Sequence, residues 1–278
     1  TRYLDEERYT TTEGTEVPNL IGILKGLPTL FDAGITPVFV FDGKPSELKA
    51  DEIAERREAR EKAEDKLEQA RKDGDVEAIR KYKTQTNRLT EAILDSSKML
   101  LELLGVPYVM ADGAGEGDAA RLANSDSTPV SGVLSSDYDS ILFGSPETIR
   151  SFSGKGPAEG VDLEATKNHH GIEQVDLINI AICIGTDYND GIHGIGPKRA
   201  LNRVTDGQDI TDIIEDTNTD LSVSDATEIQ DVFLTPPDGE SVDAYECYDP
   251  KLDKTREYLT DVWQIDQRTV DRQLNRFK

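Results

Sequence analysis

The sequence PVFVFDG, residues 37–43, decides the fold class. Its β-branched and aromatic residues are typical of a buried strand, and an acid, Asp42, stands at the carboxyl end of that strand. Three further runs of this kind follow along the chain: VPYVM at 106–110, VSGVLSSD at 130–137 and TIRSF at 148–152. Helix-forming segments lie between strands, and this order predicts an α/β fold with a parallel sheet.

Four segments have the composition and spacing of helices: 18–33, 51–83, 89–104 and 175–185. The first is amphipathic, and Pro28 is expected to interrupt it. The second is densely charged with few apolar positions, whereas the third and fourth are strongly apolar. Beyond Gly191 the sequence predicts short helices and loops, with a last helix at about 256–278.

The charge of the chain is strongly negative. Asp and Glu number 55 against 31 Lys and Arg, for a formal net charge of −24, and residues 204–250 contain no Lys or Arg at all. Such a surface favours solubility and self-repulsion, and it suits a halophilic host because dense acid keeps a protein hydrated in brine. Taken alone, the charge argues against binding to nucleic acid.

Length and cysteine content bound the remaining possibilities. The 278 residues suffice for one large domain or two modest ones. No apolar stretch approaches the roughly 20 residues of a membrane span, and no signal-peptide pattern is present. Two cysteines, Cys183 and Cys247, make no disulfide framework, so we expect a protein of the reducing cytoplasm. Because Thr1 is the first residue, we expect a processed chain or a fragment.

Six acids follow predicted strands or helices: Asp42, Glu116, Asp118, Asp137, Asp139 and Asp187. Ligands of a parallel sheet lie outside the carboxyl ends of its strands, so these side chains can converge there. Acids gathered in this way repel one another unless cations lie among them, and carboxylate oxygens favour Mg²⁺ or Mn²⁺. Two such ions about 4 Å apart support hydrolysis of a phosphodiester. Each acid taken singly is also compatible with a turn or a helix cap.

The stretch ICIGTDYNDGIHGIGPKRA, residues 182–200, joins an acid-containing turn to a glycine-rich loop. Backbone amides at a helix start bind phosphate without requiring net positive charge on the protein. The candidate DNA-binding residues are Gly194, Ile195, Gly196, Lys198 and Arg199. An ordinary glycine-rich turn between helices is the alternative interpretation of this loop.

Three blocks of the sequence together resemble the archaeal flap endonucleases of the structure-specific 5′ nuclease superfamily: VFVFDGKPSELK, SSDYDSILFGSP and the stretch 182–200. The resemblance implies a PIN-like α/β nuclease core over residues 1–189, with a helical arch at about 46–88. It also implies a helix-hairpin-helix and C-terminal helical region over 190–278. The implied activity is cleavage of 5′ flaps in DNA replication and repair, with an associated 5′–3′ exonuclease activity.

The resemblance also assigns roles to individual residues. It places four acids on the metal positions of the family: Asp42, Asp137, Asp139 and Asp187. The family's Glu-x-Glu pair falls either on Ala114 and Glu116 or, with a two-residue insertion, on Glu116 and Asp118, and we favour the second register. Lys49 and Arg56 match basic residues that face the active site from the arch. Two Mg²⁺ ions are implied, for which Mn²⁺ can substitute, and K⁺ is implied at the hairpin.

The sequence departs from the family at both ends. It starts beyond the family's first strand and its aspartate, so we expect an N-terminally truncated chain. The tail motif that binds the sliding clamp is absent, although the resemblance implies the clamp as a partner beside branched DNA with a 5′ flap. Two alternatives stay open: a catalytically disabled module of the same fold that binds DNA junctions, and a 5′–3′ exonuclease acting on another end structure.

Overall fold

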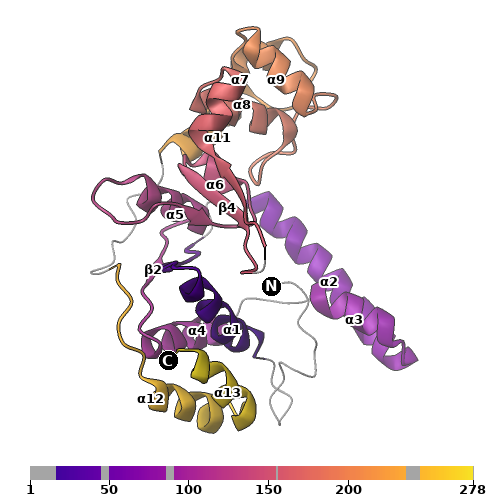
Figure 1. Cartoon of the computed structure of the whole chain (residues 1–278). Helices are drawn as coiled ribbons and strands as arrows, with labels where there is room; N and C mark the ends of the chain where they lie inside the picture. The colour runs from indigo at the N-terminus through magenta and orange to yellow at the C-terminus, as the bar shows by residue number, and fades with distance from the viewer. Residues whose placement is uncertain (1–16, 45–49, 86–90, 155, 236–244, 278) are drawn as a thin grey trace.

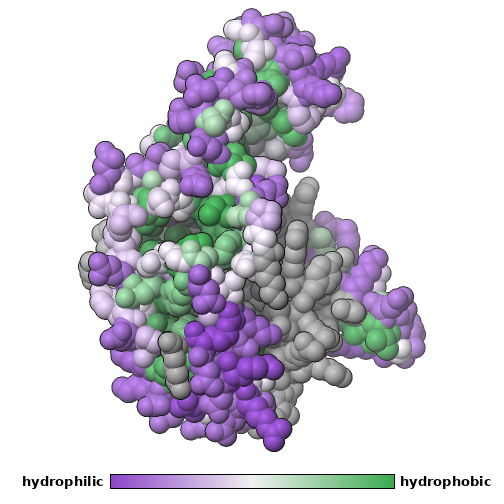
Figure 2. Space-filling view, in the orientation of Figure 1, coloured by the Kyte–Doolittle hydropathy of each residue, from purple (hydrophilic) through white to green (hydrophobic). Residues whose placement is uncertain are grey.

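The computed structural model describes five stretches of the chain: residues 17–44, 50–85, 91–154, 156–235 and 245–277. In the view of Figure 1 the strands lie in the middle of an elongated molecule, with a group of helices at either end and a helical hairpin projecting at one side. Hydrophilic residues cover most of the visible surface at both ends (Figure 2). No helix among the described residues has the length and apolar character that crossing a membrane requires.

Short strands form two sheets. In the first, β1 (Phe39–Phe41) pairs in parallel with β2 (Tyr108–Met110). In the second, β3 (Val133–Leu134) pairs in parallel with β4 (Glu147–Ser151). The four strands predicted from the sequence and the α/β fold class are therefore confirmed. Because each pair is parallel, the carboxyl ends of its two strands lie at the same edge of the sheet. Asp42 follows β1 there, and Asp137 and Asp139 follow β3.

A fifth strand, β5 (Glu159–Asp162), pairs with β4 in the antiparallel sense. The sheet is therefore mixed in its described part, whereas the sequence predicted a parallel one. The sequence of β5 is EGVD, with Val161 as its single large apolar residue, so it lacks the run that marks a buried strand. Hydrogen bonding along β4, rather than burial of its side chains, stabilises β5.

One group of helices is built on α1 (Pro18–Asp32) and α4 (Glu91–Leu103), which pack together. α1 continues through Pro28, so the expectation that this residue interrupts the helix is wrong. Leu24 before the proline and Phe31 after it pack in the same apolar cluster with α4. Tertiary packing of this face outweighs the hydrogen bond that the proline removes.

The C-terminal helices pack on the same cluster as α1 and α4. They comprise α12 (Leu252–Glu257), a π-helical turn at Tyr258–Val262 and α13 (Gln267–Leu274), followed by a 3-10 turn at Asn275–Phe277. The single helix expected at 256–278 is therefore wrong. Gln264 has a φ of 50°, which no α-helix accommodates, and Asp266 caps the new helix that starts after it.

The other group of helices surrounds α8 (Gln174–Ile184). Its members are α5 (Gly115–Asn124), α6 (Asp139–Leu142), α7 (Leu163–His170), α9 (Pro197–Thr205), α10 (Ile210–Glu215) and α11 (Val223–Leu234). Side chains from α5, α6 and α8 to α11 form a second apolar cluster in which Ile182 and Phe233 are buried. α8 thus connects the strand region to the glycine-rich loop.

The region 190–278 divides between the two clusters. Residues from Ile192 to Phe233 pack with α8, whereas residues from Leu259 to Leu274 pack with α1 and α4. The proposed domain boundary at 189/190 stays a prediction.

A helical hairpin projects beside the strands (Figure 1). It consists of α2 (Ala50–Asp73) and α3 (Val76–Gln85). The chain reverses at Gly74, whose φ of 68° suits glycine. The amine of Lys66 on α2 lies 5.7 Å from the ring centroid of Tyr82 on α3, so the two helices run back along each other. This hairpin lies in the segment 46–88, where the family resemblance implies an arch.

Candidate active site

Asp42 follows β1 and lies at the amino end of α5. Its Oδ1 accepts a hydrogen bond from the Gly115 amide at 2.9 Å. A helix amino terminus favours a carboxylate, because its free amides carry partial positive charge. A Cβ at position 115 would lie 2.9 Å from that same oxygen, so glycine permits the close approach. Glu116 comes next in the first turn of α5, which places these two candidate acids at one edge.

Asp137 and Asp139 share the loop that leads from β3 into α6. The Asp137 amide donates to Ser135 Oγ at 3.1 Å, and the Asp139 amide donates to Asp137 Oδ1 at 3.2 Å. Asp139 is the first residue of α6, and Asp137 is exposed. The loop therefore presents two carboxylates within one short turn.

Asp187 lies in a tight turn just beyond α8. The Thr186 amide donates to the Asn189 carbonyl at 2.9 Å, and the Asn189 side chain donates to the Ile182 carbonyl at 2.8 Å. Gly185, with a φ of 116°, ends the helix and starts the turn. Tyr188 packs against the cluster around α8, which ties the turn to the fold.

Asp118 differs from the expectation for a metal ligand. Its side chain is fully buried, and its Oδ1 accepts a hydrogen bond from Arg121 at 2.9 Å. Its Oδ2 accepts a hydrogen bond from the Asp112 amide at 3.3 Å. Because both oxygens already serve partners in the protein, this arrangement favours the register that places Ala114 and Glu116 on the paired positions.

The remaining acids are Asp42, Glu116, Asp137, Asp139 and Asp187. In the described part of the chain, no three acids, histidines or cysteines are grouped closely enough to hold a metal ion. The amides of Gly115 and Asp139 instead satisfy one oxygen each of Asp42 and Asp137. The donor set nevertheless fits a hard divalent cation, because it consists of carboxylate oxygens alone.

The glycine-rich loop forms a tight turn into α9. Gly194 has a φ of 80°, and Gly196 is the N-cap of the helix. In the part of the chain that the structure describes, neither glycine amide donates a hydrogen bond to another protein group. Arg199 donates to the Gly194 carbonyl at 2.8 Å, whereas Lys198 is exposed. Ile195 is buried in the cluster around α8, so its side chain anchors the loop.

Two basic residues, Lys49 and Arg56, are predicted on the arch. Lys49 lies outside the described residues. Arg56 lies within α2, but its side chain falls outside the description. Their roles stay predictions.

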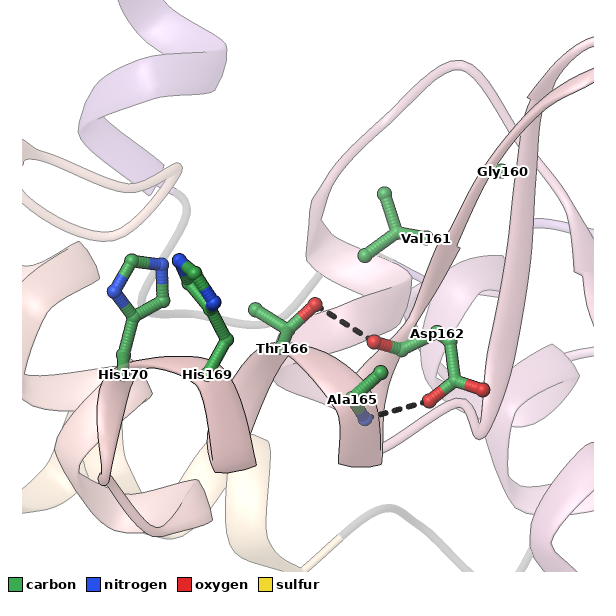
Figure 3. A pocket seen from close by; sticks show the side chains of 7 residues that line it. All are labelled: Gly160, Val161, Asp162, Ala165, Thr166, His169 and His170. Atoms are coloured by element: carbon green, nitrogen blue, oxygen red, sulfur yellow. Dashed lines mark hydrogen bonds between the residues drawn. The ribbon is translucent and has the colours of Figure 1, made fainter.

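A separate hollow of about 350 Å³ lies between β5 and α7 (Figure 3). It is lined by Gly160, Val161, Asp162, Ala165, Thr166, His169 and His170. Asp162 caps α7 by accepting a hydrogen bond from the Ala165 amide at 2.7 Å, so its carboxylate is already engaged. The hollow contains none of the candidate acids.

Cys183 precedes the turn of Asp187, and its thiol is buried. Cys183 lies on α8 and is fully buried, and burial raises the pKa of its thiol to about 11. A protonated, inaccessible thiol is neither a nucleophile nor a metal ligand.

Sequence reasoning missed two arginines at this edge. Arg121 pairs with Asp118, and Arg150 contacts the loop of Asp137 and Asp139. The spacing of three residues between Asp118 and Arg121 on a helix is a signal that could have found the first. Arg150 carries no such local signal, because its contacts form across strands.

Comparison with known proteins gives these positions a context. The XPG N-terminal domain matches residues 2–63, and the XPG I-region matches residues 105–187. The first match contains Asp42, and the second contains the other five candidate acids. The flap endonuclease 1 of Haloarcula marismortui is 40% identical over 275 residues, which cover 99% of this chain and 83% of that protein. The flap endonuclease 1 of Halobacterium salinarum is 38% identical over 268 residues, covering 96% and 81%.

The chain belongs to the flap endonuclease 1 family.

Solved structures agree with this membership. The flap endonuclease-1 from Methanococcus jannaschii matches with a TM-score of 0.72 and 32% identity, covering 96% of this chain and 83% of that one. The catalytic core of Rad2 in complex with DNA substrate matches with a TM-score of 0.70 at 21% identity, a likeness of fold. The resemblance inferred from the three sequence blocks and the nuclease-type α/β fold are confirmed. The candidate acids therefore belong to a chain of the flap endonuclease 1 family.

Proposed function

We propose that this chain is a structure-specific nuclease that hydrolyses DNA phosphodiester bonds at 5′ flaps during replication and repair, with an associated 5′–3′ exonuclease activity. The observation that carries the proposal is the position of the acids in a member of the flap endonuclease family. Asp42 and Glu116 meet at the amino end of α5, and Asp137 and Asp139 share one loop. Acids at the carboxyl ends of strands are where an α/β fold binds its ligand.

Five residues would hold the divalent cations: Asp42, Glu116, Asp137, Asp139 and Asp187. When bound, Mg²⁺ or Mn²⁺ lowers the pKa of a water molecule and neutralises charge on the leaving oxygen. The protein itself fixes the carboxylates, through the α5 amide at Asp42 and the turn hydrogen bonds at Asp137. Preorganised ligands of this kind need no rearrangement at the moment of reaction.

The residues that would bind DNA lie in the glycine-rich loop before α9 and in the arch formed by α2 and α3. The amides of Gly194 and Gly196 donate to no protein group among the described residues, and together with the start of α9 they suit a phosphate of the duplex, with Lys198 exposed beside them. K⁺ would bind at the glycine-rich loop. Arg56 and Lys49 would face the scissile phosphate from the arch. An acidic protein can hold DNA in this way because amides and metal ions, rather than net positive charge, bind the phosphates.

The cellular setting of the proposal follows from the family. The protein would act in the cytoplasm of an archaeal cell, on branched DNA that carries a 5′ flap. The sliding clamp of the replication machinery would be its protein partner.

The test is cleavage of a labelled 5′-flap substrate by the wild type and by Asp137→Ala. We expect the variant to lose cleavage by orders of magnitude, because a carboxylate that holds the metal is removed, and to bind the flap as the wild type does. Flap binding is measured by fluorescence anisotropy in EDTA. Full cleavage by Asp137→Ala would refute the assignment of the site.

A second candidate is a junction-binding module of the same fold that does not cut. It is favoured by Ala114 at the first paired position, together with the engagement of Asp118 by Arg121, because the pair then keeps a single acid. A wild type that binds 5′ flaps tightly but never cuts them with Mg²⁺ or Mn²⁺ would establish this second function.

A further inference from the structure

One side chain of β4 contacts the loop that carries Asp137 and Asp139. Arg150 Nη2 donates to the carbonyl oxygen of Ser136 at 2.9 Å, and Nη1 donates to the hydroxyl of Tyr138 at 2.5 Å. The guanidinium carbon lies 3.7 Å from the ring centroid of Tyr138. These contacts fall on the residues immediately before and after Asp137.

A second side chain of β4 contacts Ser140, the residue that directly follows the loop. Thr148 lies two residues before Arg150 on β4. The hydroxyl of Thr148 lies 3.2 Å from that of Ser140, and both residues are fully buried. Ser140 Oγ also donates to the carbonyl of Asp137 at 3.3 Å. β4 therefore holds the loop at both ends.

The remaining surroundings of Arg150 do not account for its position. Arg150 also lies 3.8 Å from the carboxylate of Glu159, whose side chain is 68% exposed, so that ion pair contributes little. The arginine side chain itself is only 23% exposed. A planar guanidinium can bond two acceptors and stack on a ring at once, which a lysine amine cannot do. The loop contacts thus use the properties specific to arginine.

We propose that Arg150 is a positioning residue that fixes the Ser136–Asp139 loop, so that the carboxylates of Asp137 and Asp139 are oriented before a divalent cation binds. The inference rests on the proposed function, which makes these two carboxylates metal ligands. Arg150 acts through the loop, because its contacts are to Ser136 and Tyr138 rather than to the acids. Removal of a group that orients a metal ligand typically costs about 10- to 100-fold in metal affinity.

The experiment compares the wild type with Arg150→Met, which keeps the bulk of the side chain and removes its charge and donors. Mn²⁺ binding to the DNA-free protein is titrated by electron paramagnetic resonance, and single-turnover cleavage of a labelled 5′ flap is measured over a range of Mn²⁺ concentrations. We expect the Kd for Mn²⁺ to rise at least about tenfold. The cleavage rate should fall at low Mn²⁺ and recover at saturating Mn²⁺, while flap affinity in EDTA stays unchanged.

Two variants of Tyr138 remove part or all of its contact with Arg150, and we compare their Mn²⁺ affinities with that of Arg150→Met. Tyr138→Phe keeps the ring beneath the guanidinium and loses one acceptor, so it should weaken Mn²⁺ binding less than Arg150→Met. Tyr138→Ala removes an exposed ring and both of its contacts, and it tests the same loop if Arg150→Met does not fold. The matched control is Arg256→Met on α12, which removes ion pairs to Asp253 and Asp271 far from the site and should leave Mn²⁺ affinity unchanged.

The outcomes separate this inference from the proposed function. Wild-type Mn²⁺ affinity in folded Arg150→Met, or in Tyr138→Ala, overturns the positioning role. An equal loss of affinity in Arg256→Met overturns it as well, because the effect would then reflect global stability. If Asp137→Ala abolishes Mn²⁺ binding while Arg150→Met has no effect, the inference alone fails. If Asp137→Ala has no effect either, the metal site itself is refuted.

Discussion

At the scale of single residues, Asp118 and Arg121 form an ion pair whose carboxylate is fully buried. Arg121→Met leaves that carboxylate uncompensated in the protein interior, so we expect a loss of about 3–5 kcal/mol in the free energy of unfolding. Asp118→Asn should cost less, because its amide oxygen still accepts from the Asp112 amide. Urea denaturation of the two variants measures both effects.

A comparison of Asp118→Asn with Asp139→Asn decides which residues occupy the paired metal positions. Asp118→Asn should leave Mn²⁺ affinity unchanged, whereas Asp139→Asn should weaken it. If Asp118→Asn weakens Mn²⁺ binding as much as Asp139→Asn does, then Asp118 is a metal ligand and the register with Glu116 and Asp118 is correct.

The acids that follow strands could be placed from the sequence because the carboxyl end of a strand fixes where its next residues lie. Asp42, Asp137 and Asp139 are cases of this kind. Asp118 could not be judged in this way, because Glu116 belongs to the Glu-x-Glu pair in both registers. Only the burial of Asp118 and its hydrogen bonds to Arg121 and the Asp112 amide distinguish them. The role of Arg150 could not be predicted from the sequence, because its contacts with the loop after β3 form only when β3 and β4 pair.

At the scale of elements, a substitution in the glycine-rich loop before α9 tests whether its backbone amides bind phosphate. Gly196 has a φ of −92°, and a Cβ there would meet no atom within 4 Å, so Gly196→Ala should fold without strain. The added methyl group would nevertheless block close approach of the amide to a phosphate. We expect duplex affinity to fall several-fold with Mn²⁺ affinity unchanged, measured by anisotropy and by titration.

The control for this prediction is Gly26→Ala in α1. A Cβ at Gly26 also meets no atom within 4 Å, and alanine favours a helix by about 0.5–1 kcal/mol. This variant should bind DNA as the wild type does. Unchanged duplex affinity in Gly196→Ala would make the glycine-rich loop an ordinary turn.

The elements that sequence reasoning misjudged are those in which distant packing or pairing overrides local preference. Pro28 sits inside a continuous α1 because apolar residues on both sides of it pack against α4. β5 forms on a nearly polar sequence because β4 offers it a free edge. By contrast, α8 was predicted almost to its ends, since its apolar run is long and Gly185 closes it.

At the scale of the whole molecule, the fold consists of two apolar clusters joined by short strands, beneath a strongly acidic surface. The order of strands and helices predicted the α/β class, because it depends on patterns repeated along the chain. The way in which residues 190–278 divide between the clusters could not be predicted. Short amphipathic helices do not specify which of two apolar surfaces they will cover.

The net charge of −24 makes stability depend on salt. Acids without nearby basic partners repel one another in the folded state, and the Debye length falls from about 10 Å at 0.1 M to about 3 Å at 1 M salt. We expect the thermal unfolding midpoint to rise by at least about 4 °C between 0.1 and 2 M KCl, which corresponds to roughly 2 kcal/mol for a chain of this size. Sucrose at equal osmolality is the control, because it stabilises by exclusion from the surface and screens no charge. A rise in KCl that sucrose reproduces would assign the effect to exclusion, and an unchanged midpoint in KCl would mean that the acids are already neutralised by local partners.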